Sequence, residues 1–123
     1  METASQTLGL LGEELAFHFL SAQGYKILLK NYECLFGEID LVAKEGGSLV
    51  FIEVKTRSSE AKGVPAEAVT PHKRRQIVKS AAYYLQRYRM LDAPCRFDVV
   101  SVWMLPGEET RLEIIRDAFG ERD

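Results

Sequence analysis

The sequence predicts an α/β (α+β) protein in which two helices pack on a mixed β-sheet, and three observations support this fold class. The chain has 123 residues, the length of one ordinary domain. Hydrophobic residues make up 46% and charged residues 28%, as is typical of soluble globular proteins. The spacing of hydrophobic residues alternates between that of helices and that of strands, in the order αβββαββ. The sequence contains no internal repeat or linker, so residues 1–123 are predicted to form a single domain.

The first half of the chain is predicted to form one helix and a run of strands. Apolar residues recur at helical spacing over residues 5–22, and Gly24 supplies a C-cap. Segments rich in Ile, Val, Leu and Phe predict strands at residues 25–31, 37–43 and 49–56. The last two form a hairpin, because Gly46 and Gly47 between them can adopt the positive φ of a tight turn.

The second half is predicted to form a loop, a helix and two strands. The loop covers Ser58–Val69. Thr70 as N-cap and Pro71 at the first helical position then begin a helix that is expected to run to Leu91. Strands complete the order at residues 97–104 and 111–115, the second at an edge of the sheet.

The composition also excludes several classes of protein. No run approaches the roughly 18 apolar residues of a membrane span, and Glu13 and Glu14 interrupt a signal-peptide pattern early. Two cysteines, Cys34 and Cys95, are too few for a disulfide framework. We therefore expect a cytoplasmic protein without a membrane partner.

The net charge of −2 hides a strong internal asymmetry. Residues 1–54 carry 3 Lys and Arg against 8 Asp and Glu, whereas residues 55–96 carry 10 against 3. Residues 97–123 are acidic again, with 3 against 7. A basic middle between acidic flanks indicates either a solvated helix face or a surface for a polyanion.

Acidic side chains are predicted to converge on one face of the sheet. Alternate residues of a strand share a face, so Glu53 and Lys55 point the same way. In the preceding strand Asp40 takes one face, and Ile39 and Leu41 share the other. If the polar faces coincide, Asp40, Glu53 and Lys55 lie together beside buried apolar groups.

A divalent cation would resolve the charge imbalance of this cluster. The first helix places Glu13 at the border of its apolar arc, where a carboxylate is costly unless it is compensated. Glu13, Asp40 and Glu53 then carry three negative charges against the single positive charge of Lys55. Hard carboxylate oxygens favour Mg²⁺ or Mn²⁺. The alternative is a partly buried salt-bridge network in which Lys55 pairs with Glu53 and Asp40.

The two strands of the hairpin resemble a known nuclease signature. Gly37–Val42 followed by Phe51–Arg57 is similar to the D…(D/E)-x-K pattern of restriction-endonuclease-like nucleases, although Ile39 rather than Pro precedes Asp40. More closely, the chain resembles the bacterial YraN family, small proteins similar to archaeal Holliday-junction resolvases. The matching segments are Gly12-Glu13, Gly24-Tyr25, Asn31-Tyr32, Glu38–Asp40, Glu53–Arg57, Ala68–Pro71 with Lys73-Arg74, and Arg96–Val99.

The resemblance implies a fold and a site. The fold would be a single restriction-endonuclease-like domain, a three-layer α/β/α arrangement around a mixed central sheet. Its metal ligands would be Glu13, Asp40 and Glu53, and Lys55 would be the catalytic lysine.

The helix predicted from Thr70 carries a basic face. No acidic residue lies between Pro71 and Leu91, so ion pairs within the helix do not account for its charges. An exposed tyrosine among cations suits contact with phosphates and stacking on bases, whereas the alternative is a solvated helix face. The residues predicted to bind nucleic acid are Thr56, Arg57, Lys73, Arg75, Lys79, Tyr83 and Arg87.

These patterns together predict a metal-dependent nuclease of DNA, with Asp40, Glu53 and Lys55 as catalytic residues. It would act as an endonuclease or an exonuclease, on substrates that include branched or flap structures. The cation would polarise the phosphodiester, and Lys55 would stabilise charge in the transition state. Resolution of a branched junction needs two active sites, hence a homodimer. The alternatives are a non-cleaving nucleic-acid-binding module on the same fold and a structural protein with an acidic salt-bridge cluster.

Overall fold

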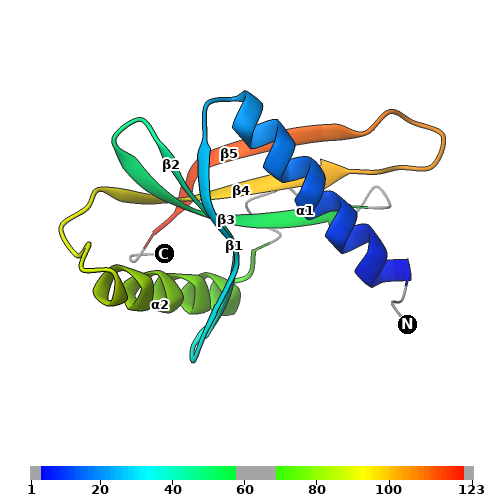
Figure 1. Cartoon of the computed structure of the whole chain (residues 1–123). Coiled ribbons are helices and arrows are strands. Elements are labelled where there is room, and N and C mark those ends of the chain that lie inside the picture. Colours follow the sequence, from blue (N-terminus) through cyan, green and yellow to red (C-terminus); the bar gives the residue numbers. More distant parts are fainter. Residues whose placement is uncertain (1–3, 58–68, 121–123) are drawn as a thin grey trace.

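The computed structural model describes residues 4–57 and 69–120, and its elements follow the predicted order αβββαββ. The elements are α1 (Ala4–Ala22), β1 (Lys26–Cys34), β2 (Gly37–Glu45), β3 (Ser48–Arg57), α2 (Pro71–Arg87), β4 (Cys95–Trp103) and β5 (Arg111–Phe119), shown in Figure 1. The loop predicted for Ser58–Val69 lies, apart from Val69, outside the described residues.

The five strands form one mixed sheet in the order β1-β2-β3-β4-β5. Neighbouring strands are antiparallel except β3 and β4, which are parallel and are connected through α2. Gly46 in the β2–β3 turn has a φ of 61°, a conformation that costs glycine little. The mixed sheet predicted from the sequence is therefore confirmed.

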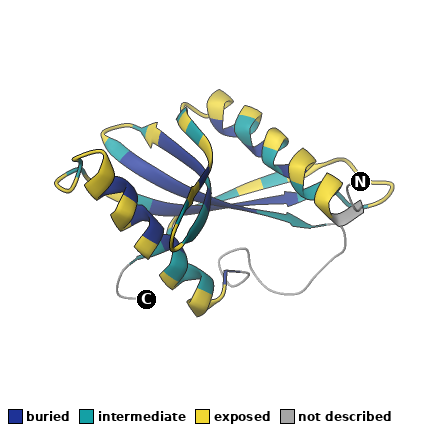
Figure 2. Ribbon diagram, turned by 60° about the horizontal axis from the view of Figure 1, so that its bottom comes forward, coloured by how far each residue is buried: buried dark blue, intermediate teal, exposed yellow. Residues whose placement is uncertain are grey.

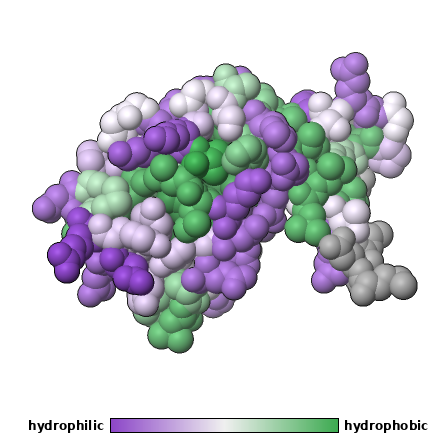
Figure 3. All heavy atoms as spheres, viewed as in Figure 1, coloured by the Kyte–Doolittle hydropathy of each residue, from purple (hydrophilic) through white to green (hydrophobic). Residues whose placement is uncertain are grey.

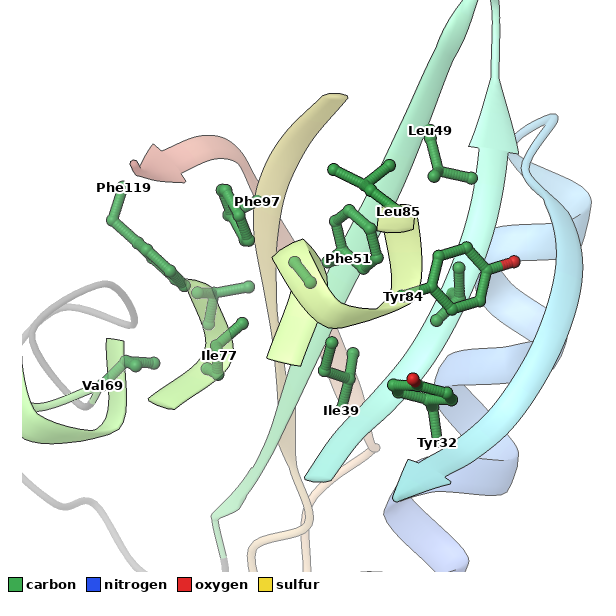
Figure 4. Close-up of a cluster of buried hydrophobic side chains, with 13 residues drawn as sticks. Tyr32, Ile39, Leu49, Phe51, Val69, Ile77, Tyr84, Leu85, Phe97 and Phe119 are labelled. Carbon is green, nitrogen blue, oxygen red and sulfur yellow. The ribbon is translucent and has the colours of Figure 1, made fainter. Parts of the chain in front are cut away.

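One helix packs on each face of the sheet, so the molecule has three layers. On one face, Tyr84 of α2 packs edge-on against Phe51 of β3 with the ring centroids 5.7 Å apart, as Figure 4 shows. On the other face, Ala16 and Leu20 of α1 are fully buried in a second hydrophobic cluster. Figure 2 shows buried stripes on the sides of both helices that face the sheet. The predicted α+β class is confirmed.

The ends of α2 show why it is shorter than expected. Thr70 caps its N-terminus, because its side-chain oxygen accepts a hydrogen bond from the Lys73 amide at 3.2 Å. The helix ends at Arg87 rather than at Leu91. Arg89 adopts a left-handed φ of 56°, and the Met90 amide donates back to the Leu85 carbonyl at 2.7 Å, which closes the helix in a Schellman-type turn.

The alternation of side chains along β2 is broken at Asp40. Ile39 belongs to the hydrophobic cluster under α2, whereas Leu41 belongs to the cluster under α1. The prediction that these two residues share a face is therefore wrong. Pairing with β3 begins only at Leu41, which lies opposite Ile52, so Asp40 sits where the two strands separate. A regular strand pattern does not anticipate such an irregularity.

A close contact between α1 and β3 depends on Gly12, which is buried. A Cβ atom there would lie 3.1 Å from the Thr56 Cβ and would overlap the Thr56 hydroxyl. We expect Gly12→Ala to lower the free energy of unfolding by about 1–3 kcal/mol, because overpacking forces α1 away from the sheet. Urea denaturation followed by circular dichroism measures this change.

Gly9→Ala is the matched control, because a Cβ at Gly9 on the same helix meets nothing within 4 Å. Alanine is the better helix former, so this variant should be neutral or stabilised by up to about 1 kcal/mol. Equal effects of the two substitutions would contradict the close contact at Gly12.

Candidate functional site

The Asp40 carboxylate is tied to the neighbouring strand. Its Oδ2 accepts a hydrogen bond from the Val54 backbone amide at 2.8 Å. This bond replaces a ladder partner at the point where β2 leaves β3. Asp40 is thereby held beside Glu53, the residue before Val54.

Glu53 is a buried carboxylate in the middle of an apolar strand. Only 5% of its surface is exposed. Its neighbours Ile52 and Val54 pack under α1, so Glu53 points to the α2 face of the sheet. Two ammonium groups approach its Oε1, Lys55 Nζ at 3.8 Å and Lys73 Nζ at 4.0 Å. Its Oε2 is buried and has no hydrogen-bond partner among the described residues.

Glu13 reaches the same region from α1. With the Asn31 amide oriented as its hydrogen bonds require, its nitrogen donates to Glu13 Oε1 at 2.9 Å and to Glu38 Oε1 at 3.2 Å. Asn31 adopts a left-handed φ of 52°, which asparagine tolerates better than most residues. The contact between Gly12 and Thr56 sets Glu13 close to the end of β3. α1 and β2 therefore bring Glu13, Glu38 and Asp40 together around the Asn31 amide of β1, and Asp40 links these acids to Glu53 in one acidic cluster.

The carboxylates of the cluster suppress one another's ionisation. Burial raises the pKa of Glu53 to about 7, the Asp40 charge adds to the rise, and Lys73 and Lys55 oppose it. Burial also raises the pKa of Asp40, although the Val54 amide counteracts this rise. The pKa of Glu13 is raised to about 7 by burial, then by Asp40 and Glu38. Such carboxylates are fully ionised at neutral pH only when additional positive charge is present.

The donor set fits a hard divalent cation. Asp40 and Glu53 carry carboxylate oxygens of the kind that such a cation binds, and the buried Glu53 Oε2 has no hydrogen-bond partner in the described part of the chain. Within residues 4–57 and 69–120, no three His, Cys, Asp or Glu side chains form a complete metal site. Mg²⁺ needs only one or two protein carboxylates, since water and substrate phosphate fill its remaining positions.

The residues predicted to bind nucleic acid divide into three groups. Lys73 lies at the acidic cluster, so the structure places it with Lys55 rather than with the rest of the basic helix face. Thr56 is held against Gly12, and the Arg57 guanidinium lies 5.8 Å from the centre of the Trp103 ring. The other members are exposed along α2: Arg75, Lys79, Tyr83 and Arg87.

Sequence reasoning missed two contributors to this region. Asn31 connects Glu13 to Glu38, and although Asn31-Tyr32 is among the segments that resemble the YraN family, that resemblance assigned Asn31 no role. Lys73 was assigned to phosphate binding, and only the packing of α2 on β3 shows its contact with Glu53.

Comparison with known proteins identifies the family of the chain. Residues 12–102 match the model of the "Uncharacterised protein family UPF0102", which spans most of the fold described above. The chain belongs to the UPF0102 family. Its resemblance to the YraN proteins is thereby confirmed, because they make up this family. A UPF0102 protein of Syntrophus aciditrophicus is 46% identical over 95% of this chain and 91% of its own length. A UPF0102 protein of Lachnoclostridium phytofermentans is 51% identical over 90% of this chain and 91% of its own length.

The matched region of this UPF0102 protein contains the acidic cluster and the two lysines beside it. Glu13 lies near its start, and Asp40, Glu53, Lys55 and Lys73 all fall within it. In the part of the chain that the structure describes, neither helix is long and apolar enough to cross a membrane.

Proposed function

We propose that this UPF0102 protein is a metal-dependent nuclease that hydrolyses phosphodiester bonds of DNA. The observation that carries the proposal is the buried Glu53 carboxylate, which faces two lysines and the Asp40 carboxylate and has one oxygen without a hydrogen-bond partner within residues 4–57 and 69–120. Buried acids with raised pKa values that converge with lysines are typical of sites that perform chemistry.

The proposed mechanism assigns each side chain a task. Asp40 and Glu53 would hold the cation, and Glu13 would assist from α1. Mg²⁺ or Mn²⁺, when bound, supplies Lewis-acid polarisation of the phosphodiester. The Lys55 ammonium would stabilise the negative charge that develops in the transition state. Lys73, at the start of α2, supplies a second ammonium with which to hold the substrate phosphate.

A structural role is the main competing explanation, because Lys55 and Lys73 both lie within ion-pair distance of Glu53. At 3.8 and 4.0 Å these pairs are longer than hydrogen bonds, so they compensate the buried charge weakly. A structural network predicts that added Mg²⁺ changes nothing and that Lys55→Ala alters stability alone.

The direct test is cleavage of a labelled substrate panel. Single-stranded, duplex, flap and four-way DNA, together with RNA, are incubated with Mg²⁺, Mn²⁺ or EDTA. We expect metal-dependent cutting of DNA that falls by about 100-fold or more in Lys55→Ala, because an electrostatic contact made in the transition state is lost. Lys44→Ala is the matched control, since it removes an equal charge from an exposed position outside the cluster.

The outcomes separate the three explanations. Binding without cutting, equal in wild type and Lys55→Ala, would favour a non-cleaving nucleic-acid-binding module. Neither binding nor cutting would favour the structural role. If the four-way junction is the preferred substrate, we further propose a homodimer, which sedimentation of the protein on that DNA measures.

A further inference from the structure

The turn between β1 and β2 exposes two large apolar side chains. Leu35 is 88% exposed and Phe36 is 42% exposed, although both side chains are apolar. Figure 1 shows this turn projecting past α2 at the bottom of the view, and Figure 3 shows a hydrophobic tip at the same place. We call Leu35 and Phe36 the apolar tip.

The apolar tip is supported by the side of α2. Gly37 lies against Gln76 and Ser80, since a Cβ built on Gly37 would be 3.8 and 3.7 Å from them. One turn further along, the Phe36 and Tyr83 rings meet with their centroids 6.2 Å apart. The tip is therefore fixed to the helix that carries the basic residues, and it does not depend on a partner for its position.

The surroundings of the apolar tip suit a nucleic acid strand whose bases are unpaired and exposed. Tyr83 is itself 41% exposed, and with Gln86 and Arg87 it lines a surface hollow of about 290 Å³. Lys79 lies one turn before Tyr83 on the exposed face of α2. Apolar wedges beside cations are the means by which proteins unstack base pairs while they hold the phosphates.

We propose that the apolar tip is a wedge that stacks on unpaired bases where duplex DNA opens into single strands. This inference rests on the proposed nuclease function and names the class of substrate for the same site. Phe36 lies in the turn directly before β2 and four residues before Asp40, so along the chain the two are at most about 13 Å apart at about 3.3 Å per residue. Stacked nucleotides of one strand are about 3.4 Å apart, so cutting is expected within about four nucleotides of the opened base pair.

Binding in EDTA tests the wedge separately from cleavage. Forked and blunt duplexes carry 2-aminopurine at the terminal base pair, and its fluorescence reports both binding and stacking. We expect Leu35→Ala to weaken fork binding by about tenfold and to leave blunt-duplex binding unchanged, because one base contact is lost. Leu35 is almost fully exposed, so its replacement should leave the fold intact, as circular dichroism verifies.

Leu91→Ala is the matched control, because Leu91 is another exposed leucine, 68% accessible, that lies beyond the C-terminus of α2. It should bind both DNAs like the wild type. The wedge proposal would be overturned if Leu35→Ala bound the forked duplex as tightly as the wild type does. If Leu35→Ala still cleaves the preferred substrate in the same position, the nuclease proposal survives that result. Loss of a protein dimer in Leu35→Ala, without a change in DNA binding, would instead assign the tip to a second copy of the chain.

Discussion

Replacement of Asp98 by alanine is expected to destabilise the fold by about 3–5 kcal/mol, because it leaves buried donors without their anion. Asp98 is fully buried and accepts hydrogen bonds from three residues. Tyr25 Oη donates to it at 2.8 Å, Arg96 Nε at 3.0 Å and the Asp117 amide at 3.0 Å. Arg96 also pairs with Glu45, so the network ties β4 to β2, to β5 and to Tyr25 in the segment before β1. Chemical denaturation at pH 7 measures the loss.

The Asp117 contact explains why an acceptor is needed at position 98, and the Arg96 guanidinium favours a charged one. The β4–β5 register shifts between Phe97 and Val99, and Asp117 adopts a left-handed φ of 53°. Its amide bonds to Asp98 where a regular strand would offer a carbonyl. Asp117→Asn is the control for this prediction, because the exposed side chain contributes little and asparagine tolerates that φ. Similar losses in Asp98→Ala and Asp117→Asn would contradict the assigned network.

Asp98 lies in one of the segments that resemble the YraN family, and it shows that a buried acid in such a segment need not belong to the candidate site. It lies between Phe97 and Val99, which face α2, so it points to the α1 face of the sheet. Glu53 points to the opposite face. Asp98 accepts hydrogen bonds from Tyr25 and Arg96, whereas one oxygen of Glu53 has no hydrogen-bond partner among the residues that the structure describes. Completeness of the hydrogen bonding, rather than burial, separates the structural acid from the candidate catalytic one.

Local signals were sufficient to predict the elements of the fold. Thr70-Pro71 fixes the start of α2, and Gly46-Gly47 fixes the β2–β3 turn, because each acts through the backbone conformation of a few residues. The end of α2 was misjudged, since Arg89 occupies a left-handed position that normally selects glycine. Such a position is stabilised by the packing around it and leaves no sequence signal.

The candidate site was only partly predictable for a related reason. Strand alternation correctly placed Glu53 beside apolar core residues, because β3 is regular. It failed for β2, where the strand is irregular at Asp40. Asn31 and Lys73 lie outside the hairpin, and only the pairing of β1 with β2 and the packing of α2 bring them to the acids. Tertiary contacts of this kind cannot be derived from periodicity.

Replacement of Asp40 by asparagine should abolish cleavage and stabilise the metal-free protein at high pH. The folded state raises the pKa of Asp40 and Glu53, the latter to about 7, so it binds more protons than the unfolded chain between about pH 4.5 and 7. The contribution of these two carboxylates to stability is therefore greatest at low pH and falls as pH rises through this window, by on the order of 2 kcal/mol. Asparagine keeps an acceptor for the Val54 amide and removes the charge that opposes ionisation of Glu53.

We accordingly expect Asp40→Asn to recover about 1 kcal/mol at pH 8 and little at pH 5, because Asp40 is only one of the causes of the Glu53 shift. Cleavage should fall by about 100-fold or more, since a ligand of the polarising cation is lost. Mg²⁺ should raise the melting temperature of the wild type at pH 8 and leave that of Asp40→Asn unchanged. Glu33→Gln removes the same charge from an exposed position on β1 and should change none of these quantities. A loss of stability in Asp40→Asn at pH 8 would mean that the carboxylate is a structural partner of the lysines and would count against the cation site.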